Sequence, residues 1–398
     1  PESVTLKIFE ASTRVAELLT LDTADLPLDR LGEQQLGDMV VEVVDPVTDY
    51  ADLMETLFDF SAIRALLQTG FTLRFDAMHA VTGPYATEIL ERRLGAAPGS
   101  VLNATPLPDF GGGHPDPNPV WAKALVDAVM GPDAPDFAAA SDGDGDRNMI
   151  LGRGVYVTPS DSLAVLAANA HLAPGYSAGL KGVARSMPTS RAVDRVAGVL
   201  GIPAFATPTG WKFFGNLLDA GMATLCGEES AGTGSDHVRE KDGLWAVLLW
   251  LNILAVRKMG VAELMADHWE RFGRNYYSRH DYEALDSATA EQLMADLRAR
   301  LPGLARTTAG ELRIEGARDF AYTDPVDGST ATAQGIEIDF EGEARVVLRL
   351  SGTGTEGATL RVYLERYAAK DTTQEPQAAL STVIAAMDAL TDLRNRTG

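Results

Sequence analysis

The sequence is short of cysteine, of positive charge and of long apolar runs. Its single cysteine, Cys226, excludes an internal disulfide and fits a reducing, cytoplasmic environment. Lysine and arginine number 34 against 56 acidic residues, so the net charge is −22 and nucleic acids or anionic membranes are poor partners. The longest apolar stretch, Leu244 to Val256, contains Asn252 and is too short to span a bilayer. An anionic substrate must therefore meet a local cluster of arginine and lysine.

The 398 residues, 45% of them hydrophobic, are enough for several globular domains. Strand and helix patterns alternate from Val40 to Tyr156 and again from Thr158 to Arg271, as in parallel sheets covered by helices. Hairpin patterns follow from Asn275, whereas Val4 to Leu19 has helical spacing and precedes a polar linker. The sequence predicts an α/β fold with domains at 41–157 and 158–273, a smaller C-terminal α+β domain at 274–398, and a segment at 1–40 that is too short for a domain.

The most informative motif alternates aspartate with glycine: Asp142, Asp144 and Asp146, followed by Arg147. The glycines permit a tight backbone, so three hard carboxylates can converge on a divalent cation such as Mg²⁺. An EF-hand is excluded, because its sixth and twelfth positions hold Arg147 and Arg153 instead of Gly and Glu. A solvated acidic turn is the alternative, but the apolar lead-in resembles a buried strand and favours a ligand site at its end.

Three further motifs each have a functional and a structural interpretation. Glu228 and Ser230 follow a strand, where they can bind sugar hydroxyls or simply begin a helix. Thr209 and Gly210 lie between a strand and a helix, where free amides suit an anion or a hydroxyl oxygen, or form an ordinary turn. Lys241 is a candidate anion contact or proton donor and acceptor, or one member of a solvated charge run.

The C-terminal motif runs from Arg349 through Ser351, Gly352 and Thr353, with Arg361 on the next strand. Alternating glycines and hydroxyl residues expose successive backbone amides, which form an anion-binding nest. Two arginines add bidentate contacts to a phosphate. The motif is neither a P-loop nor a dinucleotide fingerprint. It indicates a phosphate site, because a flexible turn accounts poorly for arginines on the flanking strands.

These four loops, in this order, resemble the α-D-phosphohexomutase family, most closely the branch shared by eukaryotes and some bacteria. The resemblance covers essentially the whole chain, and its motifs are long and ordered. It includes further segments at Asp76–His79, His114–Asn118, Ser186–Ser190, Gly273–Asn275 and Asp324–Ser329.

The resemblance implies four domains around a central cleft, three of them related mixed α/β units and the last a smaller phosphate-binding domain. Residues 1–40 would be the remnant of the first, phosphoserine-bearing domain. Mg²⁺ would be held by Asp142, Asp144 and Asp146, with Arg147 at the transferring phosphoryl group and Lys241 as general acid or base. Sugar hydroxyls would contact Thr209, Gly210, Glu228 and Ser230, and the phosphate that stays in place would contact Arg349, Ser351, Gly352, Thr353 and Arg361.

The reaction implied is the reversible conversion of α-D-glucose 1-phosphate into glucose 6-phosphate through a bound glucose 1,6-bisphosphate. A mutase for mannose phosphates or for both sugars, and a catalytically silent structural relative, are the alternatives. We expect a cytoplasmic protein, a monomer or weak homodimer, whose partner is a phosphosugar.

Two departures from the family pattern affect the expected function. The phosphoserine loop, Thr-Ala-Ser-His-Asn-Pro, does not occur in this sequence, so we expect the 398 residues alone not to turn over substrate. Ala231 stands where close relatives carry an aromatic residue, which we expect to open the sugar loop.

Overall fold

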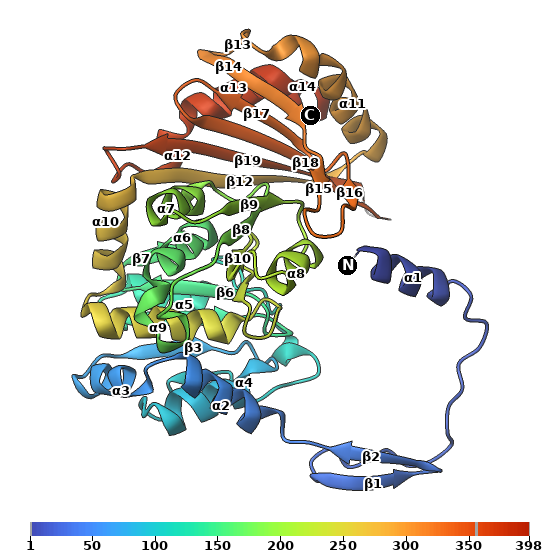
Figure 1. The fold of residues 1–398 in the computed structure, drawn as a ribbon, viewed down its shortest axis with the longest axis vertical. Helices are drawn as coiled ribbons and strands as arrows, with labels where there is room; N and C mark the ends of the chain where they lie inside the picture. The colour runs from blue at the N-terminus through green and yellow to red at the C-terminus, as the bar shows by residue number, and fades with distance from the viewer. Residues whose placement is uncertain (1, 355–356, 398) are drawn as a thin grey trace.

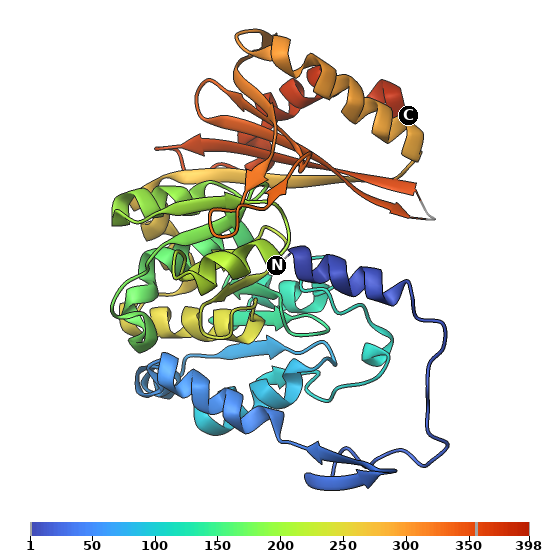
Figure 2. The same cartoon turned by 45° about the vertical axis from the view of Figure 1, so that its right-hand side comes forward.

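The computed structural model describes residues 2–354 and 357–397, and in these ranges three larger sheets lie one above another with helices packed around them (Figures 1 and 2). Two of the sheets mix parallel and antiparallel strands, and the third is antiparallel. The predicted α/β class with a distinct C-terminal α+β part is therefore confirmed.

The first sheet has the order β4-β3-β5-β6-β7, in which β4, β3 and β5 are parallel. Every residue of β5 is buried, as the apolar lead-in to the aspartate motif predicted. The strands are β3 (Leu73–Asp76), β4 (Val101–Leu102), β5 (Phe137–Ser141), β6 (Asn148–Gly152) and β7 (Val155–Val157). The helices are α2 (Pro46–Leu57), α3 (Phe60–Gln68), α4 (Thr82–Ala86), which continues into η1 (Thr87–Arg93), η2 (Phe110–Gly112) and α5 (Lys123–Met130).

The second sheet has the order β11-β10-β8-β9, and only β11 runs antiparallel. Its strands are β8 (Val183–Ser186), β9 (Ala204–Thr207), β10 (Leu225–Gly227) and β11 (Thr233–Ser235). Its helices are α6 (Pro159–Asn169), η3 (Ala170–Leu172), η4 (Pro174–Tyr176), α7 (Ala192–Leu200), α8 (Lys212–Asp219), α9 (Gly243–Arg257) and α10 (Val261–Phe272).

Helix α9 joins these two α/β units, because its residues from Gly243 to Ala255 are buried and it contacts α3, β5, β6 and β11. The side chains of both units form one hydrophobic core around it. No single helix in the described ranges has the length and hydropathy to cross a membrane. Helices α9 and α10 meet that criterion only as a pair, and they are bent by 83° at the break between them.

The third sheet is C-terminal and antiparallel, with the order β12-β19-β18-β17-β14-β13. Helices α11 and α13 pack on it and enclose a separate core. The strands are β12 (Arg274–Leu285), β13 (Thr308–Ala309), β14 (Leu312–Asp319), β17 (Ile336–Phe340), β18 (Ala344–Gly354) and β19 (Gly357–Ala368), with a small hairpin of β15 (Tyr322–Thr323) and β16 (Thr330–Ala331). The helices are α11 (Ser287–Leu304), α12 (Pro376–Ala379), α13 (Ser381–Thr391) and α14 (Leu393–Thr397).

The N-terminal segment differs from the sequence prediction. The expected helix over Val4–Leu19 is only α1 (Glu2–Ser12), and the expected polar linker contains the hairpin β1 (Gly32–Leu36) and β2 (Met39–Val43). None of residues 4–50 is buried, and both views place α1 and the hairpin outside the stacked sheets. The helix prediction failed beyond Ser12 because its apolar side chains have no core to pack against, and an isolated helix is marginal in water.

Candidate active site

The aspartate loop connects β5 to β6 and brings its three carboxylates together. One oxygen from each of Asp142, Asp144 and Asp146 lies within 4.8 Å of the others. Asp142 is buried and accepts hydrogen bonds from the backbone amide of Arg147 at 2.9 Å and from its Nε at 2.6 Å. Gly145 has φ +83°, and a Cβ there would lie 2.8 Å from the methyl group of Thr82. Three hard oxygen donors on so tight a loop fit a divalent cation such as Mg²⁺.

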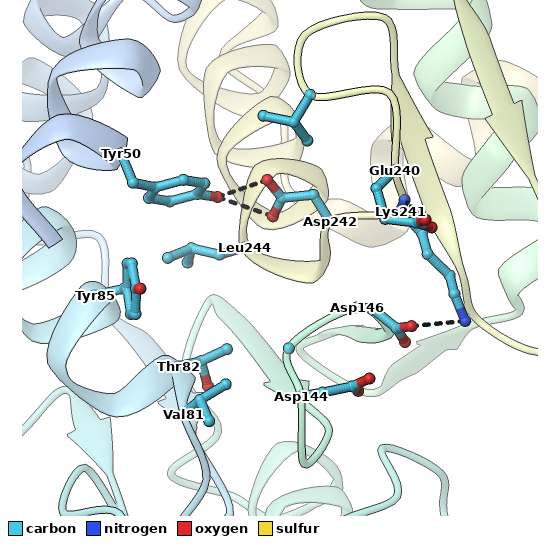
Figure 3. A pocket seen from close by; sticks show the side chains of 12 residues that line it. Tyr50, Val81, Thr82, Tyr85, Asp144, Asp146, Glu240, Lys241, Asp242 and Leu244 are labelled. Atoms are coloured by element: carbon cyan, nitrogen blue, oxygen red, sulfur yellow. Dashed lines mark hydrogen bonds and ion pairs between the residues drawn. The ribbon is translucent and has the colours of Figure 1, made fainter. Parts of the chain in front are cut away.

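Two cations lie beside these carboxylates, and they come from different parts of the chain. Arg147 ends the loop itself, and its Nη1 donates to Asp116 at 3.0 Å. Lys241 comes from the segment before α9, and its Nζ lies 2.7 Å from Asp146 (Figure 3). Burial lowers the pKa of Lys241, but the hydrogen bond and charge of Asp146 outweigh it, so the pKa lies above its usual value. The arrangement can therefore present two positive charges to a phosphoryl group next to a metal.

The two predicted sugar loops contact one another at the ends of β9 and β10. Glu228 is buried, and its carboxylate accepts a hydrogen bond from the amide of Gly210 at 2.9 Å. Burial raises the pKa of Glu228 above its usual value. The hydroxyl of Thr209 is buried and has no hydrogen-bond partner among the described residues, and Ser230 is half-buried. An unpaired hydroxyl beside a carboxylate suits a polar ligand, because an unpaired polar atom away from water is costly.

Backbone contacts join the sugar loop and the Lys241 segment to the aspartate loop. The amide of Asn148 donates to the carbonyl of Ala231 at 3.0 Å, and Arg147 pairs with Gly232 in an isolated β-bridge. The amide of Gly243 donates to the carbonyl of Gly145 at 2.9 Å. These contacts place residues from the first and second sheets in one site.

The predicted phosphate residues lie on neighbouring strands of the C-terminal sheet. Arg349 on β18 and Arg361 on β19 are directly paired in register. Arg349 is close enough to Glu228 for its charge to lower the pKa of that carboxyl, against the larger effect of burial. The Nε of Arg361 is buried without a hydrogen-bond partner in the described ranges, and Ser351 is half-buried. Gly352 and Thr353 fall on strand β18, and their predicted phosphate contacts lie outside what the structure describes.

Sequence reasoning missed several residues that hold the site together. Asp116, the partner of Arg147, lies in the proline-rich loop to which the sequence assigned no chemistry. His114 in the same loop packs against Trp121, with ring centroids 4.4 Å apart. Tyr50 donates its hydroxyl proton to Asp242 across 192 positions, a pairing that no local pattern can predict. The charged and turn-forming residues around Asp116 were the one feature of the sequence that could have pointed to this loop.

The structure has mixed α/β units whose strand-end loops meet at an acidic cluster, and a sheet that carries paired arginines follows them. Together these features define the phosphohexomutase class. Family models support this along most of the chain. Residues 48–154 and 159–272 match α/β/α domains II and III of phosphoglucomutase/phosphomannomutase. Residues 274–398 match the C-terminal domain of phosphoglucomutase-1.

Comparison with individual homologous proteins narrows this assignment. The chain is 59% identical to a phosphoglucomutase of Rhizobium radiobacter and 47% identical to human phosphoglucomutase-1, with 100% of this chain and 74% of each relative covered. It also covers 63% of a chloroplastic phosphoglucomutase of Marchantia polymorpha, at 52% identity. The chain belongs to the phosphoglucomutase family.

One solved structure agrees with this assignment, and another shares the fold. Parafusin, an exocytosis-sensitive phosphoprotein and phosphoglucomutase of Paramecium, matches in its open form with a TM-score of 0.91 and 46% identity over 100% of this chain and 73% of its own. A phosphoglucomutase/phosphomannomutase family protein of Burkholderia thailandensis shares the fold at 20% identity, with a TM-score of 0.58, over 87% of this chain and 65% of its own.

Proposed function

We propose that the complete protein containing these residues is a phosphoglucomutase, which interconverts α-D-glucose 1-phosphate and glucose 6-phosphate. The observation that carries the proposal is that Lys241 and Arg147 both pair with carboxylates of one loop, whose three carboxylate oxygens lie within 4.8 Å of one another. The relatives named phosphoglucomutase support it. The reaction would pass through glucose 1,6-bisphosphate and a phosphoserine supplied by residues outside this sequence.

In this proposal Asp142, Asp144 and Asp146 hold Mg²⁺. A bound Mg²⁺ would neutralise the charge that spreads over the oxygens of the transferring phosphoryl group. Arg147 adds a fixed positive charge on the same side, oriented by Asp142 and Asp116. Lys241 donates a proton to, or accepts one from, the sugar hydroxyl that gains or loses the phosphoryl group.

The remaining site residues bind and orient the substrate. Glu228 accepts hydrogen bonds from sugar hydroxyls, and burial makes such bonds stronger than they would be in water. The unpaired hydroxyl of Thr209 gains a partner when the sugar binds. We propose that Gly210 and Ser230 complete the sugar contacts, and that the stationary phosphate is bound by Arg349, Ser351, Gly352, Thr353 and Arg361.

Other parts of the proposal extend beyond the site. We propose domain boundaries after residues 40, 157 and 273, a cytoplasmic location, and a monomer or weak homodimer. Relatives named cytoplasmic support the location, although others are named chloroplastic. That the 398 residues alone are inactive remains a prediction.

The test is mutase turnover by the complete protein, with glucose 1,6-bisphosphate as primer and Mg²⁺ present. We expect Asp144→Asn to lower kcat roughly 100-fold or more, the scale expected on losing one group that stabilises transferring charge. It should also raise the Mg²⁺ concentration required for half-maximal activity. Asp133→Asn, the same change at an exposed carboxylate outside the site, is the matched control.

Different outcomes would point to the alternatives. Faster turnover of mannose 1-phosphate than of glucose 1-phosphate would replace the proposed substrate. An inactive complete protein would instead favour a catalytically silent relative. Equal activity of Asp144→Asn and Asp133→Asn would remove the aspartate loop from the mechanism.

A further inference from the structure

A buried chain of side-chain hydrogen bonds leads to the residue next to Lys241. The indole Nε1 of Trp245 donates to the hydroxyl of Tyr176 at 2.8 Å, and this hydroxyl lies 2.6 Å from Oγ of Ser235. Oγ of Ser235 lies 2.8 Å from Nδ1 of His237, and Nε2 of His237 lies 3.0 Å from Oδ2 of Asp242. All five residues are buried or nearly so; the side chain of His237 is 1% exposed.

The donors along this chain fit one direction. An indole N–H can only donate, so the oxygen of Tyr176 accepts from Trp245. At the other end the ionised carboxylate of Asp242 can only accept, which places the ring proton on Nε2 of His237. A neutral ring then accepts at Nδ1 from Ser235, and Ser235 in turn accepts from Tyr176. Every donor is used once, and the chain ends on a carboxylate. The geometry therefore selects one tautomer of His237.

His237 closes a loop that carries the candidate proton-transfer residue. The loop starts at Ser235, the last residue of β11, and ends at Asp242, the N-cap of α9. His237 binds Ser235 on the incoming arm with one ring nitrogen and Asp242 on the outgoing arm with the other. Lys241 lies on the outgoing arm, where its backbone pairs with Gly234.

A second element holds the same carboxylate. The hydroxyl of Tyr50 on α2 lies 2.8 and 2.9 Å from the two oxygens of Asp242 (Figure 3). Oδ1 of Asp242 also accepts from the amide of Trp245 at 2.9 Å, which caps α9. The carboxylate is thus held from a helix of the first unit, from its own helix and from His237. A shift of Asp242 would move Lys241, the residue before it.

We propose that His237 is a positioning residue for Lys241, acting through its hydrogen bond to Asp242. The inference rests on the proposed function, in which Lys241 transfers the proton. His237 does not contact the aspartate loop, and its ring stacks on Trp245 with centroids 5.2 Å apart. Its role is to hold the Lys241 backbone so that the amine reaches the position beside Asp146.

Two substitutions in the complete protein separate the bonds of His237. In His237→Gln the amide nitrogen takes the place of Nε2 and can still donate to Asp242. In His237→Asn the shorter amide replaces Nδ1 and can contact only Ser235. We expect His237→Asn to lower kcat about 10- to 100-fold, since small misplacements of a reacting group have effects on this scale. KM for glucose 1-phosphate should change less than about twofold. A substitution that removes only transition-state contacts lowers kcat and kcat/KM equally, which leaves KM unchanged.

The pattern across variants decides the matter. His237→Gln should retain kcat within about threefold, since its bond to Asp242 survives. His171→Asn, the same change at an exposed histidine, should match the parent protein. Equal loss of kcat in the Gln and Asn variants would overturn the proposal, and so would a rise in KM with kcat unchanged. Both results would indicate a structural role alone.

A readout that does not depend on activity keeps this inference separate from the proposed function. In ¹⁵N-labelled imidazole spectra of the complete protein, the signals that the His237 variants lack assign His237. We expect the His237 proton on Nε2, and a shifted Lys241 backbone amide in His237→Asn but not in His237→Gln. If the parent protein lacks mutase activity, the proposed function fails, and this spectrum decides the positioning role. A proton on Nδ1 would overturn it.

Discussion

Two interfaces hold the candidate site together, and they are built from different kinds of contact. The aspartate loop meets the sugar loop and the Lys241 segment through backbone hydrogen bonds, such as those of Asn148 to Ala231 and Gly243 to Gly145. The C-terminal sheet meets the second α/β unit through buried charged side chains, next to a small apolar cluster of Met187, Phe320, Val347 and Tyr363. The first interface therefore depends on the close approach of main chains, and the second on the pairing of buried charges.

The backbone interface requires glycine at Gly243. A Cβ at this position would lie 2.7 Å from Oγ of Ser141 and 2.4 Å from the carbonyl oxygen of Arg147, and this carbonyl cannot move without displacing the aspartate loop. Ala231 shows a related cost. Its φ of +76° lies in the left-handed region, which is unfavourable for a residue with a Cβ atom. Such contacts fix the carboxylates of the aspartate loop and Lys241 relative to one another.

The charged interface is centred on Arg345, which is fully buried on β18. Its guanidinium pairs with Glu337 on β17 at 3.2 Å and with Glu365 on β19 at 2.5 Å. It also donates to the carbonyls of Met187 and Thr189 in the second unit, each at 2.9 Å. The hydroxyl of Ser190 and the amide of Arg191 donate to the same Glu365 carboxylate, both at 2.7 Å.

The comparison suggests a division of roles. Backbone contacts hold the aspartate loop rigidly against the segments around Ala231 and Lys241, because a main chain has few alternative positions. Side-chain ion pairs hold the C-terminal sheet against the second α/β unit, and the strength of these pairs depends on charge and therefore on pH. Arg279 on β12 extends the second interface, since it pairs at 3.1 Å with Glu229, the neighbour of the candidate sugar-binding residue Glu228.

The largest effect should come from removing the central charge of the second interface. Arg345→Met keeps similar volume but leaves Glu337 and Glu365 buried with one cation fewer. We expect a loss of about 3–5 kcal/mol in unfolding free energy, the scale for breaking a buried ion pair. Hydrogen exchange of amides in β17 and β19 measures this locally, which matters because a multidomain chain need not unfold in one step.

Arg313→Met is the matched control for that change. Arg313 lies on the same sheet and pairs with Glu341 at 3.5 Å, but these side chains are 54% and 60% exposed. Exposed pairs contribute about 0–1 kcal/mol, so exchange should change little. If both variants behaved alike, the buried charges would not be what holds the interface.

A smaller effect is expected at the backbone interface from Gly243→Ala. The added methyl group must displace the carbonyl of Arg147, so we expect a loss of about 3 kcal/mol, at the upper end of ordinary overpacking. Gly198→Ala is the control, because its Cβ would meet open space in helix α7. That change should be neutral or stabilise by about 0.4–1 kcal/mol, so a similar result at Gly243 would contradict the packing argument.

The sequence predicted the site loops because each is a contiguous motif at the end of a strand. The aspartate loop follows β5, and Glu228 follows β10, so local pattern and position in the sheet agreed. The charged interface could not be predicted in this way. Glu337, Arg345 and Glu365 each look like surface charges on alternating strands, and only the packing of the second unit against that face buries them.

The same limit applies to the chain of hydrogen bonds around His237. Tyr50, Tyr176 and Asp242 are separated by more than a hundred positions or by several elements, and no spacing rule connects them. The long strand β12 and helix α11 were also not predicted, since their apolar patterns are weak and their burial depends on their neighbours. Helix α10 was not predicted either, although its buried residues Val261, Leu264, Met265 and Phe272 have helical spacing that the sequence offered. The candidate site loops could thus be located from the sequence, whereas the distant residues that support them could not.

The smallest expected effect is a change in stability with pH, which distinguishes the charged interface from the backbone interface. Burial tends to raise the pKa of Glu337, but Arg345, Arg318 and Arg191 outweigh it and lower the pKa from 4.5 to about 2. A depressed carboxyl pKa stabilises the folded protein above pH 4.5, and this stability is lost as pH falls from 4.5 towards 2. At about pH 3 the loss should reach about 2 kcal/mol, from 1.36 kcal/mol per pH unit.

Glu337→Gln isolates this contribution, because glutamine has similar size and no charge to lose. The stability gap between parent and variant should be largest near neutral pH and should narrow by about 2 kcal/mol at about pH 3. Glu341→Gln, an exposed carboxylate on the same sheet, should show no such narrowing. A gap at Glu337 that stayed constant with pH would mean that its ionised form is not what holds the C-terminal sheet. The charged interface would then depend on packing, as the backbone interface does.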